Sequence, residues 1–151
     1  MSRTVLKPLA AGALALAALF AAATGIAQQA APAAVAAARE KAVFAVSDAD
    51  AQKWNLTLGN IGNALDALGP DGAQIELVAY GPGIEMLKKD SAVARRLAEL
   101  MAKGVRVAAC QNSMRAWHLD ASDLAPGVSP VPSGVVELMK RQHEGYAYIR
   151  S

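Results

Sequence analysis

Short apolar runs alternate with segments of helical periodicity from Lys41 to Arg150, and this alternation constrains the fold more than any other feature of the sequence. Strands that alternate with helices at this spacing form parallel crossover units, whose right-handed connections place the strand-to-helix loops at one edge of the sheet. The sequence therefore predicts an α/β fold, a three-layer sandwich in which helices flank a mostly parallel sheet of about five strands. The expected strands are 41–46, 74–80, 105–109, 128–131 and 146–150.

Four longer segments show helical spacing of apolar residues, and we expect helices at 51–68, 91–103, 112–118 and 135–143. In the first helix the face towards the sheet is predicted to contain Trp54, Leu56, Leu58, Ile61, Leu65 and Leu68. In the last helix the residues expected to point inward are Val135, Val136, Leu138 and Met139. Pro130 lacks a backbone donor, so the fourth strand is expected at an edge of the sheet.

The N-terminus has the pattern of a cleavable signal peptide over residues 1–27. Arg3 and Lys7 form a positive start, Leu9 to Ala23 is uncharged and apolar, and Gly25-Ile26-Ala27 resembles a small-x-small cleavage site. An uncleaved membrane anchor is the alternative, but the apolar run is shorter than the roughly 20 residues of a spanning helix. We expect a periplasmic or secreted protein without membrane contact after cleavage, with an Ala-rich linker at 28–39 and one domain at 40–151.

The charge balance of the mature chain argues against nucleic acid as a partner. Removal of Arg3 and Lys7 leaves 13 basic residues against 13 acidic ones, so the basic pI belongs to the leader. Phosphate binding requires a surplus of basic residues on one face. One cysteine and two distant histidines offer no zinc spacing, and the segment 81–86 lacks the third glycine of a dinucleotide loop. We therefore expect neither a metal nor a cofactor.

Cys110 is the only cysteine, and it follows the third expected strand. Open α/β sheets bind ligands at the carboxyl ends of their strands, and the start of the next helix stabilises a thiolate. Such a thiolate can carry sulfur as a persulfide, attack a disulfide or be oxidised. A buried structural cysteine is the alternative. The same sheet edge is expected to gather binding residues Asn112, Gly81, Gly83, Ser133 and Gly134.

Several other residues allow a functional and a structural interpretation. Backbone N–H groups at Ser133 and Gly134 can bind an anion such as sulfite or thiosulfate, but helix capping explains the same residues. His118 is too far along its helix to contact Cys110, and His143 matches a favourable charge at a helix C-terminus. Trp117 is interpreted as a core or subunit-contact residue.

Four segments between Lys41 and Arg150 together resemble one known family. They are Trp54-Asn55 with Asn60-Ile61-Gly62-Asn63, Ala79-Tyr80-Gly81-Pro82-Gly83, Gly104-Val105-Arg106-Val107-Ala108-Ala109-Cys110-Gln111-Asn112, and Val131-Pro132-Ser133-Gly134-Val135-Val136-Glu137-Leu138 with Gln142 to Ile149. The chain resembles the DsrE/DsrF-like sulfur-relay proteins, and more closely their exported branch. The resemblance implies a parallel-sheet α/β fold, assembly into ring-like trimers or hexamers, and a cysteine after the third strand that accepts and hands on persulfide sulfur. Cys110 matches that cysteine.

Our leading hypothesis is an exported DsrE-like domain that binds or transfers sulfane sulfur through a persulfide on Cys110. Asn112 and the Gly81–Gly83 loop would shape its pocket, and the sulfur donor and acceptor are unknown. A second hypothesis is a periplasmic module that binds a small molecule or an anion at Ser133 and Gly134, without cysteine chemistry. A third is a structural subunit whose surfaces only assemble.

Overall fold

Five parallel strands form one sheet in the computed structural model, which describes residues 39–150. Their order is β4-β3-β2-β1-β5, and each neighbouring pair is parallel. The predicted signal peptide and residues 28–38 of the predicted linker lie outside the described residues. The α/β fold with a parallel five-stranded sheet is confirmed. The strands are β1 (Glu40–Val46), β2 (Ala73–Ala79), β3 (Arg106–Cys110), β4 (Ser129–Val131) and β5 (Ala147–Arg150).

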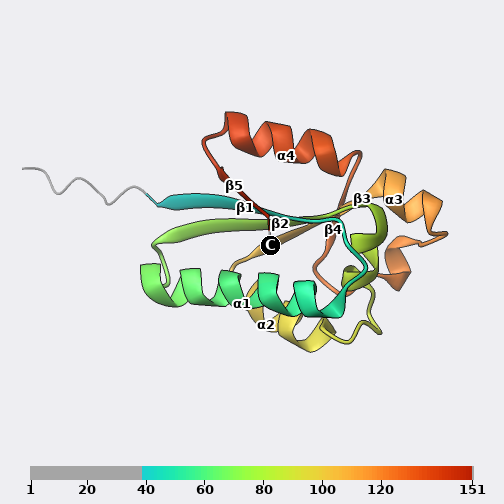
Figure 1. Ribbon diagram of the computed structural model, residues 1–151, viewed down its shortest axis with the longest axis horizontal. Coiled ribbons are helices and arrows are strands. Elements are labelled where there is room, and N and C mark those ends of the chain that lie inside the picture. Colours follow the sequence, from blue (N-terminus) through green and yellow to red (C-terminus); the bar gives the residue numbers. More distant parts are fainter. Residues whose placement is uncertain (1–38, 151) are drawn as a thin grey trace, which may run out of the picture. The chain divides into compact units, whose positions relative to one another are not determined.

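Helices cover both faces of this sheet, as the three-layer prediction requires. α1 and α2 lie on one face and α4 lies on the other, while α3 lies near the carboxyl end of β3 (Figure 1). The helices are α1 (Ala51–Leu68), α2 (Ala94–Ala102), α3 (Gln111–Ala116) and α4 (Gly134–His143), with short 3₁₀ helices η1 (Gly81–Leu87) and η2 (Ala121–Asp123). Within residues 39–150, no helix combines the length and apolar composition of a membrane span.

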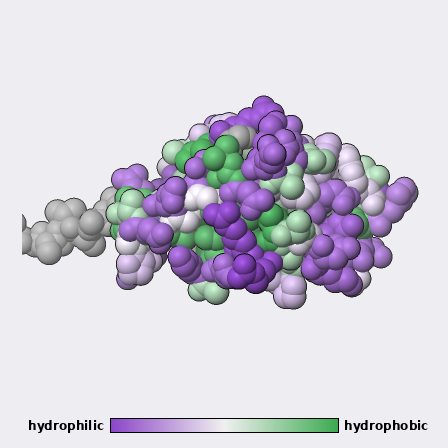
Figure 2. Space-filling view, turned by 60° about the horizontal axis from the view of Figure 1, so that its bottom comes forward, coloured by the Kyte–Doolittle hydropathy of each residue, from purple (hydrophilic) through white to green (hydrophobic). Residues whose placement is uncertain are grey.

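Two apolar clusters lie on the two faces of the sheet, because side chains alternate along each strand. The larger cluster lies between the sheet and the layer of α1 and α2, and its fully buried residues include Leu58, Leu77 and Leu97. The smaller cluster lies under α4 and consists of Val43, Ala45, Val78, Ala108, Leu138 and Tyr146. Seen from the side of α1 and α2, hydrophilic residues surround separate apolar groups on the surface (Figure 2).

Helix α1 has the predicted bounds, but part of its predicted inward face is wrong. The Asp50 side chain caps the helix by accepting from the amides of Gln52 and Lys53. The residues buried in α1 are Trp54, Thr57, Leu58 and Ile61. Leu56 and Leu68 are 55% and 43% exposed. The prediction for Leu56 is wrong because residues two apart point to different sides of a helix. Leu56 therefore cannot share a face with both Trp54 and Leu58.

Most of the apolar residues of helix α4 that were predicted to face the sheet face away from it. Val135, Val136 and Met139 are 52%, 60% and 53% exposed, and only Leu138 of the four expected residues is buried. The stripe that faces the sheet consists of Gly134, Glu137, Leu138 and Arg141, at positions i, i+3, i+4 and i+7. The reason lies in β2, where the buried carboxylate of Glu76 forms an ion pair with Arg141 beneath the helix.

Candidate functional site

Cys110 ends β3 and is also the N-cap residue of α3, so the chain turns from strand to helix at the cysteine itself. Its backbone is extended, with φ −69° and ψ 114°, and the helix begins at Gln111. The residue is 5% exposed, which places its sulfur just beneath the surface. The sequence predicted this position at a strand end, although it did not predict how little of the cysteine is exposed.

Four hydrogen-bond donors surround the sulfur of Cys110. They are the backbone amides of Gly134, Asn112 and Ser113 and the hydroxyl of Ser113. Burial raises the pKa of the Cys110 thiol, but the hydrogen bonds from Gly134, Ser113 and Asn112 outweigh it, so the pKa lies below its usual value. The arrangement therefore stabilises a thiolate, the form of cysteine that is nucleophilic.

Ser113 connects the thiol to the loop that follows β2. The amide of Gly81 donates to the Ser113 Oγ at 2.7 Å, which leaves the hydroxyl proton of Ser113 for the sulfur. Gly81 has φ +53°, a left-handed conformation that glycine adopts readily. The sequence analysis gave Ser113 no role of its own. Its position in the sequence could have identified Ser113, because the third residue of a helix lies beside the side chain of the N-cap residue.

Gly134 allows the start of α4 to approach the thiol closely. A Cβ atom on this residue would lie 2.9 Å from the Tyr80 Cβ and 3.2 Å from the Cys110 Cβ. Only glycine therefore fits where the first amide of α4 reaches the sulfur. Ser133 is the N-cap residue of α4 by position, as the capping interpretation expects, but its side chain makes no capping hydrogen bond.

The remaining predicted residues lie at the same sheet edge but do not all contact the thiol. A Cβ on Gly83 would lie 2.5 Å from the Val46 carbonyl oxygen, so this glycine allows η1 to pack against the end of β1. The Asn112 side chain accepts from Arg115 and only the backbone amide of Asn112 faces the sulfur. In the part of the chain that the structure describes, no group of three His, Cys, Asp or Glu residues is arranged to hold a metal ion.

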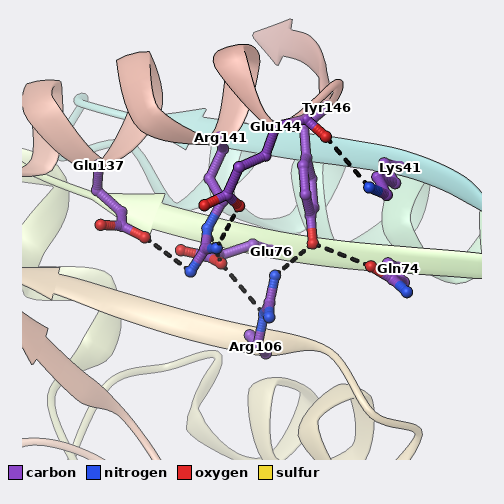
Figure 3. Close-up of polar contacts among 8 residues, drawn as sticks. All are labelled: Lys41, Gln74, Glu76, Arg106, Glu137, Arg141, Glu144 and Tyr146. Carbon is purple, nitrogen blue, oxygen red and sulfur yellow. Dashed lines mark hydrogen bonds and ion pairs between the residues drawn. The ribbon is translucent and has the colours of Figure 1, made fainter.

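A second polar cluster lies beneath α4, and the sequence analysis missed it. Glu76 Oε2 lies 2.7 Å from Arg141 Nε and 3.2 Å from Arg106 Nε, and Glu76 is only 2% exposed (Figure 3). Arg141 also pairs with Glu137 and Glu144, each at 2.8 Å. Burial raises the pKa of Glu76, and the two arginines oppose this shift only in part.

The same cluster includes Tyr146, the residue that precedes β5. The Tyr146 hydroxyl accepts from Arg106 and donates to Gln74 (Figure 3). A surface cavity of about 390 Å³ lies beside the cluster and is lined by Glu76, Glu137 and Arg141 with residues of β3 and β4. One sequence signal for this cluster is Glu76 itself, a charged residue between the apolar residues Ile75 and Leu77.

Comparison with known proteins places the chain in a family. The model of the DsrE/DsrF-like family matches residues 26–150. A solved protein of unknown function from Methanobacterium thermoautotrophicum, MTH1491, is 38% identical, with a TM-score of 0.71 over 74% of this chain and 99% of its own. No match is found among curated proteins.

Two further solved structures share the fold at low sequence identity. The ychN protein from E. coli is 17% identical, with a TM-score of 0.62 over 74% of this chain and 99% of its own. A conserved protein of unknown function from Bacteroides thetaiotaomicron, BT1422, is 16% identical, with a TM-score of 0.60 over 77% of this chain and 98% of its own. With the family match extending over most of the sequence, the chain belongs to the DsrE/DsrF-like family.

Proposed function

We propose that Cys110 accepts a sulfane sulfur as a persulfide and passes it to an acceptor thiol. The observation that carries the proposal is the set of four donors on the Cys110 sulfur, which favours the thiolate in a site that is almost closed to solvent. Membership in the DsrE/DsrF-like family supports a role related to sulfur relay.

Both steps of this reaction balance without an external oxidant. In loading, the Cys110 thiolate attacks the outer sulfur of a donor persulfide or polysulfide, a new S–S bond forms, and the donor thiolate leaves with the electron pair of the old bond. In transfer, an acceptor thiolate attacks the outer sulfur on Cys110, and the Cys110 thiolate leaves in turn. Because Cys110 is 5% exposed, we expect slim donors such as polysulfide to load it faster than bulky disulfides.

The mature chain acts outside the cytoplasm in this proposal. The leader pattern of residues 1–27 supports export, and the balanced charge of the remaining chain suits a small donor rather than a polyanion. Fractionation of cells that express the full-length chain tests this part. Export predicts a periplasmic or secreted product that begins after Ala27, and a full-length cytoplasmic product contradicts it.

The outward face of α4 supports self-association, and the resemblance to ring-forming relatives suggests a trimer or hexamer. Val135, Val136 and Met139 form an exposed apolar group on this helix, and each is at least half exposed. Size-exclusion chromatography with light scattering tests the proposal. Val136→Glu should convert the assembly to monomer, whereas Leu56→Glu, at a similarly exposed position on α1, should not. A monomeric wild type contradicts self-association.

Intact mass spectrometry tests the proposed loading. The mature wild type and Cys110→Ser are incubated with polysulfide and freed of the donor, and their intact masses are then measured. The proposal predicts a gain of one sulfur mass on the wild type that a thiol reductant removes, and no gain on Cys110→Ser. An unmodified wild type, or equal gains on both proteins, would overturn it.

A further inference from the structure

Charged side chains contribute to the contact between helix α4 and the sheet. Among the buried residues of α4, Leu138 is the only large apolar one, and the neighbouring inward residues are Glu137 and Arg141. Arg141 Nε lies 2.7 Å from the Glu76 carboxylate, which projects from β2 and is 2% exposed (Figure 3). Buried ion pairs require close geometry, because a displaced partner leaves a charge without compensation. The Glu76–Arg141 pair therefore links α4 to β2 at a buried position.

The same helix supplies one donor to the candidate site. The amide of Gly134, the first residue of α4, bonds to the Cys110 sulfur. A Cβ atom on Gly134 would collide with the Tyr80 Cβ, so the start of the helix lies close to the end of β2. Arg141 lies seven residues further along, roughly 10 Å at 1.5 Å per residue. A rigid helix transmits a displacement at Arg141 to the Gly134 amide.

We propose that Glu76 and Arg141 are positioning residues for Cys110, whose ion pair fixes α4 on the sheet and so keeps the Gly134 amide on the thiol sulfur. The inference rests on the proposed role of Cys110, because the position of the amide affects function only if the thiol reacts. It adds to that proposal two residues that contact neither the sulfur nor its donors.

Positioning and through-space charge predict opposite results for one substitution. Glu76→Gln removes a negative charge, and a field effect alone would then lower the pKa of the thiol. Loss of the ion pair instead loosens α4 and weakens the Gly134 hydrogen bond, which raises the pKa. The double variant Glu76→Gln/Arg141→Met removes one charge of each sign. A field effect then largely cancels, whereas the loss of positioning remains.

The experiment measures the rate of Cys110 alkylation by iodoacetamide against pH in the mature protein. The variants are Glu76→Gln, which keeps the side-chain size, and the double variant, which removes both partners of the Glu76–Arg141 pair together and leaves Glu137 without Arg141. Arg95→Met is the matched control, because it removes an ion pair with Glu99 from a side chain that is 91% exposed. Circular dichroism establishes that each variant is folded.

We expect both variants to move the midpoint of the pH profile upward by about one unit, which slows alkylation about tenfold below the midpoint. The limiting rate at high pH and the whole profile of Arg95→Met stay as in the wild type. Midpoints that do not move in either variant would overturn the inference. A lower midpoint in Glu76→Gln with no change in the double variant is the pattern of a field effect and would also overturn it.

A second measurement tests the route through Gly134. In a Gly134→Ala background the amide is already displaced, so Glu76→Gln should add no further shift, and full additivity of the two shifts contradicts the route. The proposed function is tested separately by persulfide loading of the wild type. If the wild type takes no sulfur but the variants show these shifts, the proposed function is overturned and the positioning inference stands. If the wild type takes sulfur but the variants show no shift, the proposed function stands and the positioning inference is overturned.

Discussion

Gly134→Ala tests the close approach of α4 to the candidate site. The added methyl group would lie 2.9 Å from the Tyr80 Cβ, a distance that real Cβ atoms essentially never show, and 3.2 Å from the Cys110 Cβ, which is tighter than most real contacts. Tyr80 follows β2 and Cys110 ends β3, so neither Cβ can move without its backbone. The start of α4 must therefore move away, and its amide then leaves the Cys110 sulfur.

The expected magnitude follows from the hydrogen bond and the steric conflict. A hydrogen bond to a charged group contributes about 1.5–3 kcal/mol, which corresponds to a rise of about one to two units in the pKa of the thiol. Overpacking at a well-packed position costs a further ~1–3 kcal/mol of folding stability. Alkylation at a pH below the wild-type midpoint should slow about tenfold to a hundredfold, and urea unfolding should show the lower stability.

Gly62→Ala is the matched control for this change. Gly62 lies inside α1, and an added Cβ there meets nothing within 4 Å. Alanine in a helix interior is favoured over glycine by roughly 0.5–1 kcal/mol, so this variant should gain stability. Its rate of Cys110 alkylation should depend on pH as in the wild type. If Cys110 alkylation in Gly134→Ala depends on pH as in the wild type, the Gly134 amide does not lower the pKa of the thiol and the reasoning is refuted.

Three further predictions concern Ser113, Glu76 and the main core. Ser113→Ala removes the hydroxyl donor and should raise the pKa of the Cys110 thiol; an alkylation profile identical to that of the wild type would contradict this. The raised pKa of Glu76 means that the folded chain holds a proton on this carboxyl where the unfolded chain has released it. The free energy of unfolding should therefore fall as the pH rises from about 4.5 through the folded pKa, and Glu76→Gln should flatten this slope in urea titrations; a slope of the opposite sign would refute it. Leu58→Ala, at a fully buried position of α1, should lower the free energy of unfolding by about 2–5 kcal/mol, and a loss below 1 kcal/mol would contradict the assigned core.

The fold could be predicted because its signals are local. Helix α1 has the predicted bounds, since Asp50 caps one end and Gly69-Pro70 follows the other. The edge position of β4 followed from Pro130, which cannot donate to a neighbouring strand. Alternation of strands and helices then fixed the parallel sheet and placed Cys110, Gly81 and Gly134 at one edge.

The inward face of α4 could not be predicted, because it depends on a charge in another element. Apolar periodicity assigns Val135, Val136 and Met139 to the core, but the buried Glu76 of β2 attracts Arg141 and turns the opposite side inward. The sequence gives no distance between two residues so far apart along the chain. Ser113 was missed for a related reason, because close packing, not residue type, brings its hydroxyl to the thiol.

The most direct test of the central claim is the release of sulfur from the loaded protein. Cyanide attacks the outer sulfur of a persulfide and yields thiocyanate with restoration of the thiolate. After loading with polysulfide and removal of the donor, the wild type should release about one thiocyanate per chain, the stoichiometry of a single persulfide. Cys110→Ser should release none. A wild type without thiocyanate, or a Cys110→Ser variant that releases as much, would contradict a persulfide on Cys110.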